Sequence, residues 1–222
     1  MTDTSTLILP GLDGTDLMLA PFLKSIPKEN SPAVGLLPDD PKMGYSELAA
    51  HFSPRMSDQS SVHIIAESFS GPIGVLLARQ HQDVVKRLTL VASFVTSPVP
   101  SIASFLPWSI IFRLPMPAWV ASRYFVGDDR ALIPSLQNAV KQHHPATLRN
   151  RLALVQSVDV SEQYAGLECE LTYIRPSHDR LVPRHCGDKI LEINPATKCH
   201  RIDGPHLILQ TQPDNSWQAI AE

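Results

Sequence analysis

The feature that most constrains the fold is the stretch VHIIA at residues 62–66, which is followed closely by a second apolar run at 71–81. The first run is short and almost continuously apolar, which is typical of a strand in a parallel sheet covered on both faces. The second run, GPIGVLLARQH, has Pro72 in its first turn and apolar residues along one side, which predicts a helix. A strand that leads directly into a helix is the repeating unit of an α/β fold.

The same alternation of strands and helices runs through most of the chain. We predict strands at 6–9, 33–37, 62–66, 87–93, 170–175 and 198–202. We predict helices at 19–26, 45–52, 71–81, 183–193 and 207–221. This order indicates a single α/β domain over residues 1–222, with a mostly parallel sheet of about six strands and helices on both faces.

Residues 97–166 interrupt this alternation. Five of the twenty prolines lie within 98–117 and six of the fourteen aromatic residues within 105–125, and helix-like stretches follow at 130–142 and 145–157. We interpret 97–166 as a helical lid inserted in the α/β domain before the strand at 170–175. Its aromatic residues can be ordinary core packing, but the inner face of a lid also lines the site that it covers. The candidate substrate-binding residues are therefore Phe105, Trp108, Phe112 and Trp119.

Composition and charge exclude several classes of function. The net charge of -3, without a basic cluster, argues against binding to nucleic acid. The apolar segment 102–120 contains Arg113 and three prolines, so we expect no membrane span. The histidines and cysteines show no metal-ligand spacing, and we expect neither a metal nor a cofactor. Three cysteines without a disulfide framework, and a first segment without signal-peptide features, predict a cytoplasmic protein.

Four polar features follow predicted strands: PGLDG at 10–14, Ser68 in AESFSG, Asp179 in RPSHDRLVP and His206 in DGPHLILQTQP. The carboxyl ends of parallel strands meet at one edge of a sheet, where active sites of open α/β sheets lie. A serine hydroxyl is a weak nucleophile until a base removes its proton, and a histidine at the same edge can supply that base. We therefore expect these four features to form one site.

The order of serine, aspartate and histidine, together with PGLDG, resembles the α/β-hydrolase superfamily over nearly the whole chain. The resemblance implies that Ser68 is the nucleophile, His206 its base and Asp179 the residue that orients the imidazole. It also implies that the backbone N–H groups of Leu12 and Phe69 bind the oxyanion. Asp159 is an alternative acid if the acid has moved to the insertion.

The nucleophile motif departs from the superfamily pattern at three positions. Ala66 and Ser70 stand where glycine is usual, and both are small enough for a tight turn. Glu67 precedes the nucleophile, where an ionised carboxylate facing the site would oppose formation of an oxyanion. We expect the Glu67 side chain to point away from the site.

The resemblance implies a serine hydrolase that cleaves an ester or thioester of a small, hydrophobic substrate through an acyl-enzyme. Two alternatives remain open from the sequence. One is a carbon–carbon bond hydrolase or acyltransferase with the same three residues. The other is a catalytically inactive member of the fold that binds a small ligand under its lid. The sequence does not give the oligomeric state.

Overall fold

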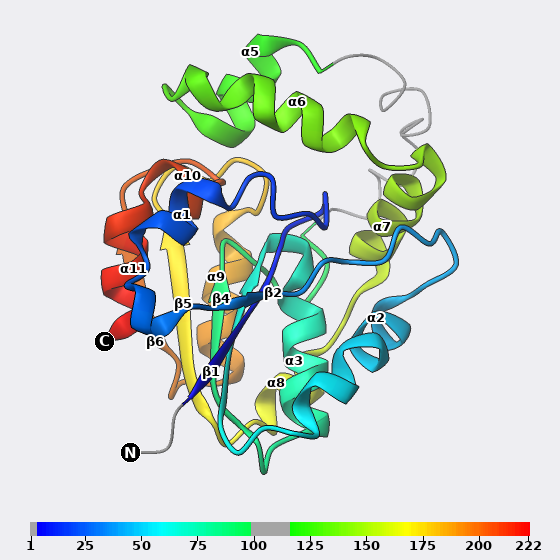
Figure 1. The fold of residues 1–222 in the computed structure, drawn as a ribbon, viewed down its shortest axis with the longest axis vertical. Helices are drawn as coiled ribbons and strands as arrows, with labels where there is room; N and C mark the ends of the chain where they lie inside the picture. The colour runs from blue at the N-terminus through cyan, green and yellow to red at the C-terminus, as the bar shows by residue number, and fades with distance from the viewer. Residues whose placement is uncertain (1–3, 99–115) are drawn as a thin grey trace.

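The computed structural model describes residues 4–98 and 116–222 (Figure 1). Its six strands form one sheet in the order β2-β1-β3-β4-β5-β6, and every neighbouring pair is parallel. The strands are β1 (Ser5–Leu9), β2 (Ala33–Val34), β3 (Val62–Glu67), β4 (Val85–Val91), β5 (Glu170–Pro176) and β6 (Lys198–Ile202). The prediction of a six-stranded parallel α/β sheet is confirmed.

Helices cover both faces of this sheet because alternate strand residues point to opposite sides. Leu7, Ile64 and Leu88 pack on one face, whereas Ile8 and Ile65 pack on the other. The helices that contribute buried residues to the first face are α2 (Tyr45–Phe52), α3 (Gly71–Gln80), α8 (Ser161–Ala165) and α9 (Arg184–Ile193). Those on the second face are α1 (Ala20–Ser25), α10 (Ile208–Thr211) and α11 (Pro213–Ala221).

Two predicted elements differ from the structure. The strand predicted at 33–37 is only two residues long, because after Gly35 the chain turns and the Leu37 N–H donates to the Gly14 carbonyl. The helix predicted at 207–221 is divided into α10 and α11 at Pro213. Proline lacks an N–H and disfavours helical geometry in the preceding residue, and Gln212 has a non-helical backbone.

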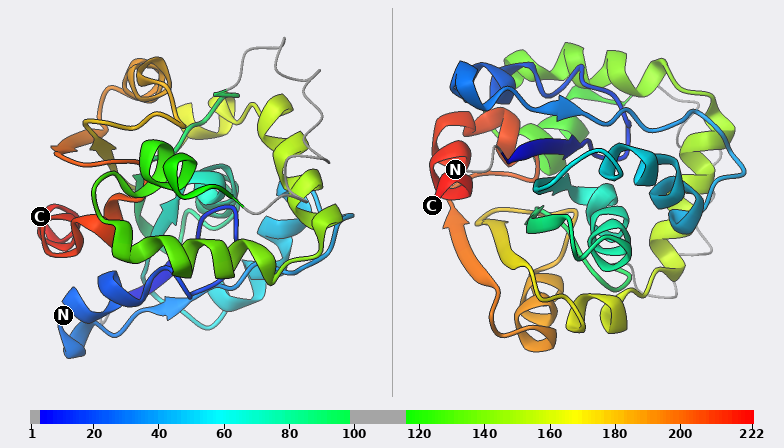
Figure 2. Two further views of the ribbon diagram at one scale, coloured as in Figure 1. Left: turned by 90° about the horizontal axis from the view of Figure 1, so that it is seen from above. Right: turned by 60° about the horizontal axis from the view of Figure 1, so that its bottom comes forward.

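The described chain between β4 and β5 contains α5 (Ala118–Ala121), α6 (Ile133–Lys141) and α7 (Pro145–Ser157), followed by α8. Helices α5 and α6 lie at the top of the molecule in Figure 1, and the view from above shows them across the end of the sheet (Figure 2). Leu136 of α6 packs with Met18 and Leu207 in a separate apolar cluster. Phe105, Trp108 and Phe112 lie outside the described residues. No helix in the described ranges is long and apolar enough to cross a membrane.

Candidate active site

Ser68 lies at a sharp turn between β3 and α3. Its φ angle is 49°, a left-handed value that is uncommon for residues other than glycine. The Oγ of Ser93, which follows β4, donates to the Ser68 carbonyl at 2.6 Å and holds this turn in place. A strained serine at a strand-to-helix turn is the geometry that exposes a nucleophilic hydroxyl at the edge of a sheet.

The residues that replace the usual glycines fit this turn for different reasons. Ala66 faces Gly74 of α3, where a Cβ atom would lie only 2.9 Å from the Ala66 Cβ. Gly74 on α3 therefore allows the close approach of helix and strand that a glycine in place of Ala66 would otherwise allow. The Ser70 Oγ donates to the carbonyl of Pro10 and joins the turn to the 10–14 loop. The sequence shows that Ala66 and Ser70 replace glycines, but the contacts that compensate for these replacements are visible only in the structure.

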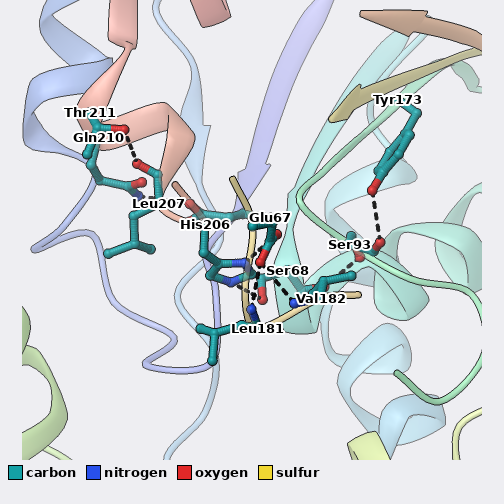
Figure 3. Close-up of polar contacts among 11 residues, drawn as sticks. Glu67, Ser68, Ser93, Tyr173, Leu181, Val182, His206, Leu207, Gln210 and Thr211 are labelled. Atoms are coloured by element: carbon teal, nitrogen blue, oxygen red, sulfur yellow. Dashed lines mark hydrogen bonds and ion pairs between the residues drawn. The ribbon is translucent and has the colours of Figure 1, made fainter. Parts of the chain in front are cut away.

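His206 and Asp179 complete a chain of hydrogen bonds with Ser68. The His206 Nε2 lies 2.9 Å from the Ser68 Oγ, and the His206 Nδ1 lies 2.8 Å from an Asp179 carboxylate oxygen. The other Asp179 oxygen accepts the backbone N–H groups of Leu181 and Val182 at 2.8 and 2.9 Å. Figure 3 shows the His206 ring beside Ser68. With Nδ1–H donating to Asp179, Nε2 is the ring nitrogen that accepts the proton of Ser68. The structure thus brings the three predicted side chains together.

Asp159, the alternative acid, does not belong to this group. Its carboxylate accepts hydrogen bonds from the backbone N–H and the hydroxyl of Ser161. It therefore stabilises the start of α8, away from His206.

Burial and two nearby carboxyl groups have opposite effects on the pKa of the His206 imidazole. Burial alone would lower the pKa of His206, because a charged ring is poorly solvated in the interior. The charge and hydrogen bond of Asp179, with a further contribution from Glu67, outweigh burial and raise the pKa of His206 above its ordinary value. A more basic imidazole is a better acceptor for the Ser68 proton.

The prediction that Glu67 points away from the site is wrong. Glu67 is only 3% exposed and lines the cavity beside Ser68, and its carboxyl oxygen Oε2 would lie 3.7 Å from a Cβ on Gly11 of the 10–14 loop. Gln210 Nε2 donates to the Glu67 carboxyl group at 2.9 Å, and the backbone N–H of Gly11 donates to this group as well, so two donors hold it there. Burial, reinforced by the charge of Asp13, outweighs these hydrogen bonds and raises the pKa of Glu67 to about 7. A large share of Glu67 is therefore protonated and neutral near neutral pH.

Leu12 and Phe69 are also among the residues that line the cavity beside Ser68. Within the described part of the chain, neither N–H donates a hydrogen bond to another residue. The 10–14 loop approaches Ser68 closely, since a Cβ on Gly11 would lie 3.9 Å from the Ser68 Cβ. Two backbone donors without a hydrogen-bond partner, one of them in the residue after Ser68, are an arrangement that can bind a developing oxyanion.

An apolar cavity of about 280 Å³ opens beside Ser68 and His206. Apolar side chains from several elements line it, among them Met18, Phe94, Phe125, Leu148, Leu152 and Leu207. The structure does not bring Trp119 to this cavity: this residue is 69% exposed and lines a second hollow, between α5 and the loops that follow β5 and β6. Leu148 and Leu152 share a face of the predicted helix 145–157, and that pattern could have identified them from the sequence.

Residues 4–98 and 116–222 contain no cluster of three or more histidine, cysteine, aspartate or glutamate side chains that could hold a metal ion.

Comparison with solved structures identifies the fold. An enol-lactonase from Burkholderia xenovorans is 16% identical and superposes with a TM-score of 0.80 over 98% of this chain and 90% of its own. A carboxylesterase from Nitrososphaera gargenis is 11% identical, with a TM-score of 0.80 over 99% of this chain and 89% of its own. A bromoperoxidase from Bacillus anthracis is 14% identical, with a TM-score of 0.80 over 99% and 91% of the two chains.

The chain has the α/β-hydrolase fold. No family model and no curated protein matches its sequence. At identities of 11–16% the structural likeness establishes the architecture of this chain alone, and its activity has to be argued from the site.

Proposed function

We propose that the protein is a serine hydrolase that cleaves a carboxylic ester or thioester of a small, apolar substrate through an acyl-enzyme. The observation that carries the proposal is the chain of hydrogen bonds from Ser68 through His206 to Asp179 at the wall of an apolar cavity. The proteins of similar fold include an enol-lactonase and a carboxylesterase, which is consistent with ester cleavage.

In the proposed reaction, the Ser68 Oγ attacks the substrate carbonyl while His206 Nε2 takes the hydroxyl proton. The carbonyl oxygen becomes an oxyanion and accepts the N–H groups of Leu12 and Phe69. Collapse of the tetrahedral intermediate breaks the ester or thioester bond, and His206 returns the proton to the leaving alcohol or thiol. Water, deprotonated by His206, then attacks the acyl-enzyme and releases the acid and free Ser68.

The lining of the cavity favours an uncharged acyl group as the part of the substrate that binds there. Its lining is mainly aliphatic and aromatic, and its described carboxyl groups belong to Asp13 and Glu67. A carboxylate on the acyl chain would be desolvated in this apolar lining, which costs several kcal/mol. We further propose that the described helices α5, α6 and α7 belong to a lid over this cavity, within a single domain.

Replacement of Ser68 by alanine tests the proposal. We expect Ser68→Ala to abolish hydrolysis of p-nitrophenyl and thioester substrates of graded acyl length and to abolish labelling by a fluorophosphonate probe. Ser60→Ala, at an exposed serine outside the site, is the matched control and should retain both activities. Turnover by folded Ser68→Ala protein at the wild-type rate would contradict the mechanism.

A further inference from the structure

An arginine from α7 is buried behind the proposed oxyanion site. Arg151 is 2% exposed and is the largest fully buried side chain in the described chain. It is not among the residues that line the cavity, so it does not contact substrate there. Burial lowers the pKa of Arg151, and the charges of Asp39 and Asp13 oppose that shift. A guanidinium in such a place is costly unless its donors are satisfied.

The donors of Arg151 reach the backbone of the oxyanion loop. Nη1 donates to the carbonyl of Leu12 at 2.7 Å, and Nη2 donates to the carbonyl of Pro38 at 2.9 Å. The guanidinium carbon also lies 6.0 Å from the centre of the Phe69 ring, within the range of a cation–π contact. One side chain therefore contacts both residues whose N–H groups are the proposed oxyanion donors.

The loop is shaped around this guanidinium. Gly14 has a φ of 70°, and a Cβ at this position would lie 2.7 Å from the Arg151 Nη1. Glycine at 14 is thus required by both the backbone geometry and the proximity of the arginine. The Gly14 carbonyl in turn accepts the N–H of Leu37, which ties the loop to the chain beyond β2.

We propose that Arg151 is the positioning residue of the oxyanion site, an inference that rests on the proposed serine-hydrolase function. The C=O and N–H of Leu12 belong to the peptide units on either side of one Cα, so holding the carbonyl restricts rotation of the unit that carries the N–H. The contact with Phe69 fixes the second donor from the same point. The positive charge behind both donors also favours negative charge in front of them, where little water screens it.

The test uses Arg151→Met, which keeps an unbranched side chain but loses the charge and the donors, and Arg151→Lys, which keeps the charge but loses the planar pair of donors. Arg149→Met, at an exposed position on the same helix, is the matched control. Circular dichroism and thermal unfolding define a temperature at which each variant is folded. Steady-state hydrolysis of a p-nitrophenyl ester then gives kcat and KM.

We expect Arg151→Met to lower kcat on the order of 100-fold and Arg151→Lys about tenfold, with KM changed less than about threefold, since a single oxyanion donor is worth about 100- to 1,000-fold. Binding of an alkyl boronic acid, which forms a tetrahedral adduct with Ser68, should weaken in parallel with kcat/KM. A merely structural role would lower the unfolding temperature but leave kcat of the folded enzyme unchanged. The Arg149→Met variant should match the wild type in every measurement.

The outcomes separate this inference from the proposed function. Unchanged kcat and boronic acid affinity in folded Arg151→Met, with an active wild type, would overturn the inference alone. A wild type that neither hydrolyses esters nor labels at Ser68 would contradict the proposed function, and the inference with it. If Arg151→Met does not fold, the same criteria apply to Arg151→Lys.

Discussion

Replacement of Glu67 by glutamine removes one ionisable proton beside Ser68 and changes the shape of the side chain very little. The glutamine carbonyl can still accept the hydrogen bond that Gln210 donates to the carboxyl group in the wild type. The variant therefore isolates the cost of ionising a carboxyl group in this buried position.

The structure sets both the size and the sign of the effect. Burial first, and then the charge of Asp13, raise the pKa of Glu67 to about 7 from the ordinary value of 4.5. A group with a raised pKa in the folded protein stabilises it below the unfolded pKa, and this contribution is lost as the pH rises to the folded pKa. At about 1.4 kcal/mol per pH unit, the loss for the wild type is about 3 kcal/mol.

We therefore expect the unfolding free energy of Glu67→Gln, relative to that of the wild type, to increase by about 3 kcal/mol as the pH rises from 4.5 to 8.5. Urea unfolding followed by tryptophan fluorescence at intervals across this range measures the difference. Glu29→Gln, at an exposed position, controls for the loss of one negative charge from the chain. A wild-type-to-variant difference that stays constant within about 0.5 kcal/mol across the range would refute the reasoning.

Three further substitutions test other parts of the site. Asp179→Asn should lower kcat by on the order of 10⁴-fold with little change in stability, because the amide favours the wrong tautomer of His206; ester kinetics and thermal unfolding measure the two effects. Gly71→Ala should destabilise the fold by about 2 kcal/mol in urea unfolding, because the new Cβ would lie 1.8 Å from the Ser93 Oγ. Leu152→Trp should fill part of the cavity and lower kcat/KM for p-nitrophenyl octanoate about tenfold more than for the acetate; equal losses would place the acyl group elsewhere.

The sheet could be predicted from the sequence because its signals are local. A run such as VHIIA is apolar on both sides, and the strand that it predicts is buried on both faces. The short β2 could not be predicted in the same way. Its length is set by the hydrogen bond from the Leu37 N–H to the Gly14 carbonyl, which depends on residues far apart in the sequence.

The residues of the candidate site were predictable to a similar degree. Ser68, Asp179 and His206 follow strands, and a parallel sheet brings such positions to one edge. The substrate-binding residues were harder to predict, because a cluster of aromatic residues in the sequence does not show which way each side chain points. Trp119 is exposed and lines a different hollow, whereas the aliphatic face of α7, including Leu152, lines the cavity beside Ser68.

Glu67 and Arg151 show why burial has to be known before charge can be interpreted. From the sequence, a carboxylate beside the nucleophile is an obstacle to oxyanion formation, and an arginine inside a helix is an ordinary surface residue. In the structure both side chains are buried near Ser68. Burial, and then the charge of Asp13, raise the pKa of Glu67 to about 7, so a large share of Glu67 is neutral near neutral pH. Burial also lowers the pKa of Arg151, but a guanidinium stays protonated in proteins.

Near neutral pH, the combined charge of Glu67 and Arg151 is therefore more favourable to an oxyanion at Ser68 than a fully ionised Glu67 would allow. This arrangement has a consequence for the pH dependence of the proposed reaction. Ionisation of Glu67 above pH 7 adds a negative charge beside the oxyanion and should lower kcat/KM, while the same charge helps to raise the pKa of His206. Glu67→Gln should thus remove the alkaline decline and move the acidic limb to lower pH. An alkaline decline that persists in the variant would show that this limb belongs to another group.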